Sequence, residues 1–497
     1  MALISIIENF QPLNSERLLA RAAELTPTLF REEREPLRLP EGSIGKGESV
    51  VLDFGGHLVG RLTLTLSFSG SHPDAPAFLR LRFAETAREL EEDLRDNQGW
   101  LSQSWIQEEQ LHVDLVPSEL ALPRRYAFRY VKLTVLDTSP KYRLRVNRAV
   151  CVTESSADWS QIKPLRSGNA QLDRIHAASL KTLAECMQLE LEDGPKRDQR
   201  LWLGDLRLQA LTNAVSFRNF DLVKRCLYLF GGSRFPDGRV SANVFTRPEP
   251  AADDTFLFDY ALLFPAVLEE YLQETGDAEA LDDLYEIAMA QLDYGLRQQE
   301  RGVVNARTVR ETFIDWSDTL DKSAAAAGVL LCALGYGMAL AERKGDTARL
   351  ERLREERDAL RQAVMERYWD ETRSCFVSNG QISAASQVWL VLADAGTDAQ
   401  ARLAMEKALT LTGEPRMTTP YMHHYFVMAQ LHVGLRDEAE RHLCAYWGGM
   451  LAAGADTFWE CWDPEHPAHS PYGGLLLNSY CHAWSCTPAW IIEKYLL

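Results

Sequence analysis

The sequence lacks the features that link a protein to nucleic acid or to an oxidising compartment. Its 53 basic residues are outnumbered by 71 acidic ones, for a formal net charge of -18, so it has no basic excess to hold a polyanion. The nine cysteines are scattered and odd in number, and no His or Cys cluster has zinc spacing. We therefore expect no nucleic-acid partner, no disulfide framework, no metal or other cofactor, and a reducing, cytoplasmic compartment.

A strongly apolar segment of membrane-spanning length is also missing. The longest uncharged run, Ala324 to Ala341, is at the lower length limit for a bilayer span and is mostly Ala and Gly. We predict a buried helix there. The first residues, Met1 to Asn9, lack a basic region, and Glu8 interrupts their apolar run too early for a signal peptide. We expect no membrane partner.

Two or more domains are expected, because 497 residues exceed the size at which a single hydrophobic core usually stops growing. Up to about Val152, apolar and polar residues alternate at period two, as in the stretch from Gly60 to Phe68, and Gly and Pro separate the runs. Several short strands with turns between them predict an antiparallel β-sandwich over residues 1–155. It contains no catalytic grouping, so we expect a structural or accessory role.

The period becomes helical from about Ser167 onward. About a dozen segments with one apolar face follow, joined mostly by short polar loops, and Gly276-Asp277 and Gly345-Asp346 have the pattern of one helix ending and the next beginning. So many helices within residues 156–497 predict a helical toroid of the (α/α)6 type. A superhelical array is the alternative, but no repeat of fixed length supports it. A toroid has a concave end where alternate loops converge, and we place the chemistry there.

Four segments between predicted helices combine carboxylates with aromatic rings. Carboxylates accept hydrogen bonds from sugar hydroxyls, and indole faces cover the apolar patches of a pyranose. An aromatic wall also raises the pKa of a neighbouring carboxylic acid. This composition predicts a carbohydrate site built from residues 193–205, 253–260, 313–318 and 456–463, with His482 and Trp484 downstream.

Several of these residues also fit a simpler role when taken alone. Trp316 alone is typical of a core aromatic residue. Asp259 is typical of a solvated or helix-terminal charge, and His482 is typical of a core histidine. Glu460 is harder to explain in this way, because a carboxylate flanked by two tryptophans needs a partner or a chemical task.

The order of the motifs resembles that of glycoside hydrolase family 78, the α-L-rhamnosidases. The matching parts are Asp-x-Pro-x-Arg-Asp-x-Arg-Leu from Asp193, Gly-Asp ending at Asp205, Asp-Trp from Asp315, Thr-x-Trp-Glu-x-Trp-Asp from Thr457, and a downstream His. Residues 53–60, 81–85 and 128–131 are similar to the β-sandwich module that commonly precedes the catalytic domain in that family.

This resemblance covers essentially the whole chain. It implies an (α/α)6 barrel that releases terminal α-L-rhamnose, with inversion, from rhamnosides of the flavonoid or oligosaccharide type. Many members work without a metal. The expected partners are therefore rhamnose-containing small glycosides, and a homodimer is left open.

The resemblance also implies roles for individual residues. Glu460 matches the general base, which activates a water beneath the anomeric carbon. The other matched positions hold or surround the rhamnose or shape the pocket wall: Asp193, Arg197, Trp202, Asp205, Asp259, Asp315, Trp316, Trp459 and His482.

One position departs from the family pattern. Gln199 stands where the family usually has its general acid Glu, and an amide has no proton to give to a leaving oxygen. Three explanations are open: Asp193 or Asp198 serves as the acid, the substrate carries a good leaving group such as a phenolic flavonoid oxygen, or the protein binds a sugar without cleaving it. We favour the first, because Glu460 and the other carboxylates are present.

Two further functions remain as alternatives at this point. One is another inverting (α/α)6 glycosidase that acts on a glucoside or an unsaturated uronide. The other is a non-catalytic sugar-binding homologue, for which Gln199 is the main argument.

Overall fold

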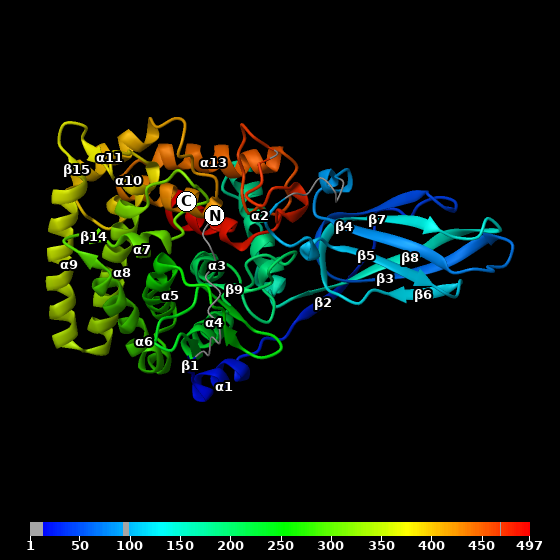
Figure 1. Ribbon diagram of the computed structural model, residues 1–497, viewed down its shortest axis with the longest axis horizontal. Helices are drawn as coiled ribbons and strands as arrows, with labels where there is room; N and C mark the ends of the chain where they lie inside the picture. The colour runs from blue at the N-terminus through cyan, green and yellow to red at the C-terminus, as the bar shows by residue number, and fades with distance from the viewer. Residues whose placement is uncertain (1–12, 93–98, 468) are drawn as a thin grey trace.

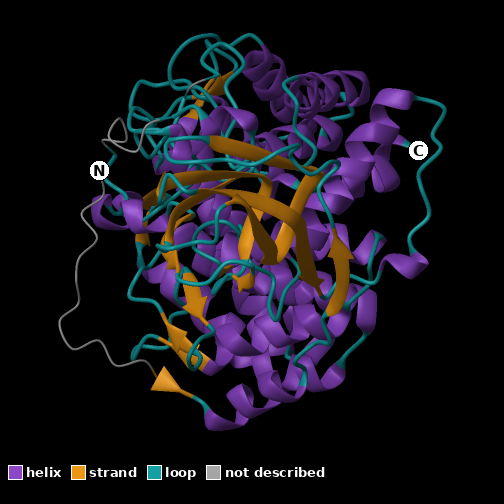
Figure 2. Cartoon of the chain, turned by 90° about the vertical axis from the view of Figure 1, so that its right-hand side faces the viewer, coloured by secondary structure: helices purple, strands orange, loops and turns teal. Residues whose placement is uncertain are grey.

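The chain folds into a β-domain and a helical region that lie side by side, as the computed structural model of residues 13–92, 99–467 and 469–497 shows (Figure 1). Viewed from the β-domain end, the curved strands lie in front of the helices (Figure 2). The strands come first in the chain and most helices follow, which is the predicted order. The N-terminal stretch Met1 to Asn9, considered above as a signal peptide, lies outside the described residues.

The β-domain is one antiparallel sheet with the strand order β2-β8-β3-β7-β4-β5, and β6 also pairs with β3. Its longest strand changes partner along its length: β3 pairs with β7 over residues 49–60 and with β8 over residues 60–70. The strands are β2 (Phe30–Arg34), β3 (Ser49–Gly70), β4 (Ala77–Ala84), β5 (Glu108–Val113), β6 (Ser118–Ala121), β7 (Tyr126–Asp137) and β8 (Tyr142–Ser155).

The core of the β-domain follows from the alternation in the sequence. Leu62, Leu64 and Leu66 of β3 are fully buried and pack with Leu81 and Leu133 of two other strands. The buried residues of this cluster all come from the sheet domain itself, residues 44–151, so the sheet curls and covers its own apolar face. The predicted antiparallel β-domain is confirmed.

The helical region is built from successive helix pairs. α3 contacts α4, α5 contacts α6, α8 contacts α9, α10 contacts α11, and α12 contacts α13. The contacts then return to α2, which touches both α13 and α3, so the first and last helices of the region are neighbours. The helices are α2 (Ala170–Cys186), α3 (Leu203–Val215), α4 (Phe220–Gly232), α5 (Phe258–Thr275), α6 (Ala278–Arg297), α7 (Ala306–Arg310), α8 (Ser323–Lys344), α9 (Thr347–Tyr368), α10 (Ala384–Leu392), α11 (Asp398–Leu409), α12 (Pro420–His432), α13 (Arg436–Ala452) and α14 (Pro488–Ile491).

Two helix ends are set by the residues predicted to set them. Gly276 and Gly345 cap α5 and α8 in the left-handed conformation, with φ of 65° and 72°. The following residues begin the next helices, since the side chains of Asp277 and Asp346 accept hydrogen bonds from backbone N–H groups of α6 and α9. These tight connections place consecutive helices antiparallel.

The first helix of the chain belongs to the helical region. α1 (Glu16–Glu24) packs against α4 through Leu18 and Ala22, and β1 (Leu13–Asn14) pairs with β10 (Ser233–Arg234). The apolar face of α1 is thus buried against a helix and not against the sheet. The first strand of the sheet, β2, begins at Phe30, and the last, β8, ends at Ser155. The domain limits 1–155 and 156–497 stay predictions.

The uncharged run predicted as a buried helix forms most of α8. Within the described residues, α8 is the one helix long and apolar enough to cross a membrane, but 72% of that window is buried inside the protein. α8 contacts α5, α6, α9 and α10, so its apolar surface is used in the core.

Candidate active site

Three of the four acidic-aromatic segments lie where helices begin. Asp205 is in the first turn of α3, Asp259 is in the first turn of α5, and the segment around Asp315 precedes α8. The fourth segment, with Glu460, follows α13 and is hydrogen-bonded to residues 478–485. These loops meet at one end of the helical region.

Glu460 is held by groups from two other parts of the chain. Arg197 donates to both of its carboxylate oxygens, at 2.7 and 3.1 Å, and the Tyr472 hydroxyl donates to Oε1. All three side chains are buried. Although burial acts to raise it, Arg197 holds the pKa of the Glu460 carboxyl below its ordinary value. Glu460 is therefore an ionised carboxylate inside the protein.

His482 lies among three carboxylates. Its Nδ1 atom is 3.3 Å from Asp205 Oδ1, and its Nε2 atom is 3.7 Å from Glu460 Oε1 and 4.0 Å from Asp193 Oδ2. Burial lowers the pKa of His482 to about 4, so the imidazole is neutral near neutral pH. Trp484 packs on it with 4.4 Å between ring centroids. His482 is therefore a buried histidine that also lies next to the carboxylates of the site.

The pKa values of Asp193 and Asp205 are shifted in the opposite direction from that of Glu460. Burial raises the pKa of Asp193 well above its ordinary value, and the nearby Asp198 and Asp205 add to the shift. Burial likewise raises the pKa of Asp205, with Glu460 as the next cause. Carboxyl groups whose environments push their pKa values apart have the arrangement needed for an acid and a base.

Asp198 and Gln199 lie in a tight turn of the early loop. Both are in the left-handed region, with φ of 57° and 51°, a conformation that costs energy for residues other than glycine. The turn is closed by a hydrogen bond from the Asp193 N–H to the Arg200 carbonyl at 2.9 Å. Gln199 Nε2 donates to the Pro195 carbonyl at 2.8 Å. The Gln199 amide thus stabilises its own turn.

Aromatic rings pack beside these polar groups. Trp316 meets Tyr472 edge to face at 5.9 Å, and Trp202 meets Tyr260 in the same way at 6.3 Å. Both indoles are half-buried, and within the described residues neither Nε1 atom has a hydrogen-bond partner. Trp202 and Trp316 therefore bring aromatic rings, with Nε1 atoms that are buried, to the loops that carry the carboxylates.

Asp259 and Asp315 have their oxygens occupied by the protein. Asp259 accepts hydrogen bonds from the backbone N–H groups of Phe313 and Ile314, both at 2.9 Å. Asp315 accepts from the Thr418 N–H at 3.1 Å and from the Thr419 hydroxyl at 2.6 Å, while burial raises its pKa to about 6. Both carboxylates thus fix the loop that carries Trp316, and their predicted place in the rhamnose pocket stays a prediction.

Trp459 faces the core. Its ring packs edge to face on Trp462 at 5.2 Å and on Tyr480 at 5.3 Å, in a hydrophobic cluster with residues of α2 and α13. This packing does not place Trp459 in the predicted sugar-facing wall.

Tyr472 was missed by the sequence reasoning. Besides its hydrogen bond to Glu460, its ring lies under the Arg197 guanidinium, 4.0 Å from ring centroid to Cζ. Tyr472 belongs to an irregular stretch between Glu460 and His482 that has neither period, so only the run Ser-Pro-Tyr-Gly-Gly marks it as a turn.

A cavity of about 640 Å³ lies elsewhere in the helical region. It is lined by middle and late turns of α5, α8 and α12, whereas Asp205 and Asp259 lie in the first turns of α3 and α5, and Asp193 and Glu460 lie in loops. Arg207 in its wall donates hydrogen bonds to Glu270, Tyr336 and Tyr425. The cavity is thus distinct from the site around Glu460.

Two family models match consecutive parts of the chain. Residues 22–153 match the N-terminal domain of glycosyl hydrolase family 78 α-rhamnosidases, and residues 160–495 match the bacterial α-L-rhamnosidase six-hairpin glycosidase domain. No curated protein sequence matches the chain.

Solved structures give the same result. A rhamnosidase from Klebsiella oxytoca with rhamnose bound is 43% identical, with a TM-score of 0.95 over 98% of this chain and 100% of that one. A family 78 rhamnosidase of Bacillus sp. GL1 is 20% identical, with a TM-score of 0.76 over 97% of this chain and 48% of that one. The Streptomyces avermitilis α-L-rhamnosidase complexed with L-rhamnose is 19% identical, with a TM-score of 0.72 over 94% and 44%. The last two likenesses concern the fold alone.

The match to the helical domain covers more than half of the chain, and the Klebsiella enzyme is similar over nearly all of it. The chain therefore belongs to the α-L-rhamnosidases of glycoside hydrolase family 78 and is a glycoside hydrolase that acts on rhamnosides.

Proposed function

We propose that the protein releases terminal α-L-rhamnose with inversion of the anomeric carbon, with Glu460 as the general base and Asp193 as the general acid. The observation that carries this proposal is the meeting, at one imidazole, of a carboxyl group whose pKa is lowered and one whose pKa is raised. His482 Nε2 lies 3.7 Å from Glu460 Oε1 and 4.0 Å from Asp193 Oδ2.

The two carboxyl groups are close enough to act on one glycosidic bond. Because both distances share the His482 Nε2 atom, the two oxygens lie at most about 8 Å apart, an upper limit compatible with both the roughly 6.5–9.5 Å of inverting and the roughly 5–5.5 Å of retaining glycosidases. In the proposed step Glu460 removes a proton from that water, and the water oxygen bonds to the anomeric carbon. The glycosidic bond breaks, and its oxygen takes the proton of Asp193.

Asp193 is favoured over Asp198 as the acid. Asp193 is buried beside His482, and burial raises its pKa well above the ordinary value, which is the direction that a general acid needs. The Asp198 side chain is 19% exposed, and its carboxylate lies 3.8 Å from Arg197 Nε. The proton lost with the family's usual Glu at position 199 is thus supplied by a carboxyl group of the same loop.

The surrounding side chains suit a 6-deoxy sugar. Arg197, Asp205 and His482 offer hydrogen-bonding groups, while Trp202 and Trp316 offer apolar faces for the methyl group on C5 and the ring C–H patches. The Klebsiella relative holds rhamnose, which supports a rhamnose-binding role for these residues. Rhamnose-containing small glycosides are the proposed substrates.

A reducing, cytoplasmic compartment is part of the same proposal. All nine cysteines are free thiols. The sulfurs of Cys186 and Cys481 lie 4.0 Å apart and remain unbonded in the buried interior, which suits a compartment that keeps thiols reduced.

The stereochemistry of the first product tests the mechanism. Proton NMR during cleavage of an aryl α-L-rhamnoside should show the β-anomer of rhamnose first, with the α-anomer appearing later by mutarotation. If the α-anomer appeared first, Glu460 would not act through a water, and the proposal of inversion would be wrong.

A further inference from the structure

We propose that the β-domain contributes to the active site. Its residues Glu85 and Glu89 are positioning residues for the loops that carry Arg197 and His482. This inference rests on the proposed roles of Glu460 and its partners. It gives the β-domain a task beyond the structural or accessory one expected from the sequence.

A bulge in β3 directs the first contact toward the helical region. The pairing of β3 with β7 shifts register between Asp53 and Leu58, and Gly55 in this bulge has a φ of 82°. The bulge places His57 at the domain boundary, fully buried, with its backbone N–H donating to Asp456 Oδ2 at 2.7 Å. Asp456 opens the segment that contains Glu460.

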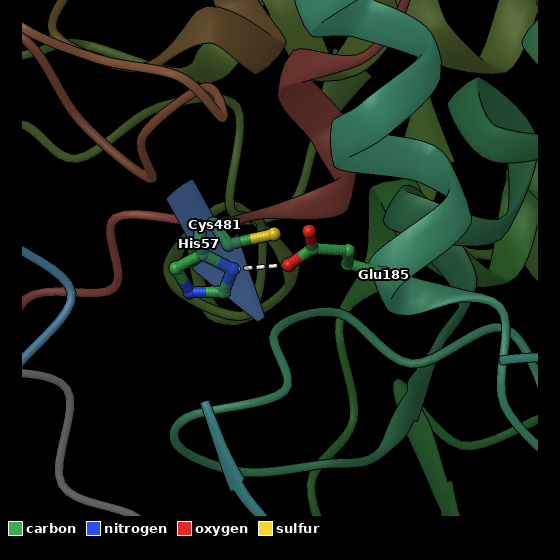
Figure 3. Close-up of side chains that lie close together, drawn as sticks. All are labelled: His57, Glu185 and Cys481. Atoms are coloured by element: carbon green, nitrogen blue, oxygen red, sulfur yellow. Dashed lines mark hydrogen bonds and ion pairs between the residues drawn. The ribbon is translucent and has the colours of Figure 1, made fainter. Parts of the chain in front are cut away.

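The His57 ring bridges carboxylates of both domains. Nδ1 faces Glu185 of α2, with Cys481 beside it (Figure 3), and Nε2 lies 2.8 Å from Glu85 Oε1 of the β-domain. Although burial opposes the charge, Glu185 holds the pKa of His57 well above its ordinary value. Both ring nitrogens thus lie in hydrogen-bond range of carboxylates, one from each domain.

Glu85 continues the connection to the His482 segment. Its second oxygen, Oε2, accepts a hydrogen bond from the backbone N–H of Tyr480 at 2.7 Å. Both residues are buried. A charged acceptor fixes this N–H strongly, and Tyr480 is two residues from His482. The β-domain therefore sets the position of the strand-like segment that presents His482 to the carboxylates.

Glu89 makes the connection to the Arg197 segment. Lys196 Nζ donates to Glu89 Oε1 and to the Asn478 carbonyl, the latter at 2.8 Å. The other oxygen of Glu89 accepts from the backbone N–H groups of Glu85 and Thr86, both at 2.8 Å. Glu89 itself is therefore rigidly held within the β-domain. Because Lys196 directly precedes Arg197, this ion pair fixes the residue that clamps Glu460.

Burial makes it costly to break these ion pairs and hydrogen bonds between the domains. Lys196, Glu85 and Glu89 are each less than 5% exposed, and a buried charge without its partner is strongly unfavourable. The loops of the site thus have one low-energy position relative to the β-domain. If Glu89 loses its charge, the one remaining carboxylate partner of Lys196 is Glu85, whose Oε2 atom lies 3.5 Å from Lys196 Nζ. We expect Lys196 to shift toward Glu85 and Arg197 to shift with it.

The test compares two isosteric substitutions in the full-length protein. Glu89→Gln removes the nearer of the two carboxylate partners of Lys196 and is expected to lower kcat on an aryl α-L-rhamnoside at least tenfold. Glu108→Gln is the matched control: Glu108 is a nearly buried carboxylate of the same domain, paired with Arg82 at 3.0 Å within the β-domain. The control should leave kcat unchanged even where it lowers the melting temperature as much.

The pH profile gives a readout that a loss of stability alone does not move. A displaced Arg197 no longer favours the ionised form of Glu460, so in Glu89→Gln the acid limb of kcat/KM should shift upward by about one pH unit. Glu108→Gln should keep the wild-type limb. In a protein that already carries Lys196→Met, Glu89→Gln should lower kcat much less than it does in the wild type. If the two losses of kcat were additive, Glu89 would not act through Lys196.

Hydrogen exchange separates this inference from the mechanism on which it rests. In Glu89→Gln, the amides of residues 193–205 and 478–482 should exchange faster than in the wild type and in Glu108→Gln, whatever the role of Glu460. Glu85→Gln provides a second variant, expected to loosen residues 478–482, should Glu89→Gln not fold. If both variants match Glu108→Gln in exchange, kcat and acid limb, the β-domain does not position the site.

Discussion

Arg197 clamps Glu460 with two hydrogen bonds, from Nη2 to Oε1 at 2.7 Å and from Nη1 to Oε2 at 3.1 Å. The two residues are 263 positions apart in the chain, and the contact joins the first acidic-aromatic segment to the last. Planar guanidinium and carboxylate groups match in this geometry. The charge state of the base is therefore controlled by a residue near the beginning of the helical region in sequence, whereas the base lies near its end.

The first prediction concerns the base. Glu460→Gln should lower kcat on an aryl α-L-rhamnoside by several orders of magnitude, because an amide cannot take a proton from water. Binding of free rhamnose, measured by calorimetry, should change much less. Near-normal turnover of this variant would show that another group activates the water.

The second prediction identifies the acid. Asp193→Asn should be slow on alkyl rhamnosides with a poor leaving group and nearly normal on an aryl substrate with a good one, because a good leaving group needs no proton. Asp198→Asn should be slowed about equally on both. If the two variants exchanged these behaviours, Asp198 would be the acid.

The third prediction is the shape of the pH profile. The lowered pKa of Glu460 keeps the base ionised into the acidic range, so the acid limb of kcat/KM should lie below pH 4.5. The raised pKa of Asp193 keeps the acid protonated, so the other limb should lie well above its ordinary 3.8. Activity falls below the first pKa as Glu460 gains a proton and above the second as Asp193 loses one. Asp193→Asn should abolish only the upper limb.

The fourth prediction tests the clamp. Arg197→Lys keeps a positive charge but gives up the paired hydrogen bonds, so the pKa of Glu460 should rise and the acid limb should move toward neutral pH by about one unit. The direction is fixed, because a weaker cationic contact favours the protonated carboxyl. If the acid limb of kcat/KM did not move, the hydrogen bonds from Tyr472 and the Ser479 N–H would be sufficient to keep Glu460 ionised.

Much of the fold could be predicted from periodicity. The alternation around Gly60–Phe68 forms strand β3, the helical segments follow in the expected half of the chain, and Gly276 and Gly345 end helices as expected. The position of α1 could not be predicted, because its amphipathic pattern does not specify which neighbour covers it. Local signals specify elements, and their partners are set by contacts between distant residues.

The composition of the segments predicted which of them form the site, but it did not predict toward which side each side chain points. The segments with Asp193, Glu460 and His482 meet as expected, yet Trp459 points into the core. Which side an aromatic residue takes in an irregular segment has no periodic signal. Tyr472 was missed for the same reason. The role of Glu89 depends on a contact between two domains and has no mark in its own neighbourhood in the sequence.

The last prediction concerns the glycine of the Gly-Asp motif. A Cβ atom at Gly204 would overlap the Tyr260 ring, which is buried against α3. Gly204→Ala should therefore displace the start of α3, with Trp202 and Asp205, and lower the free energy of unfolding by about 1–3 kcal/mol. Gly335→Ala is the control, since the nearest atom to its Cβ is 4.0 Å away in the middle of α8; it should stabilise the protein by up to about 1 kcal/mol. Chemical denaturation measures both changes, and kcat should fall only for Gly204→Ala. Equal stability and activity of the two variants would show that α3 and Tyr260 can separate without disturbing Asp205.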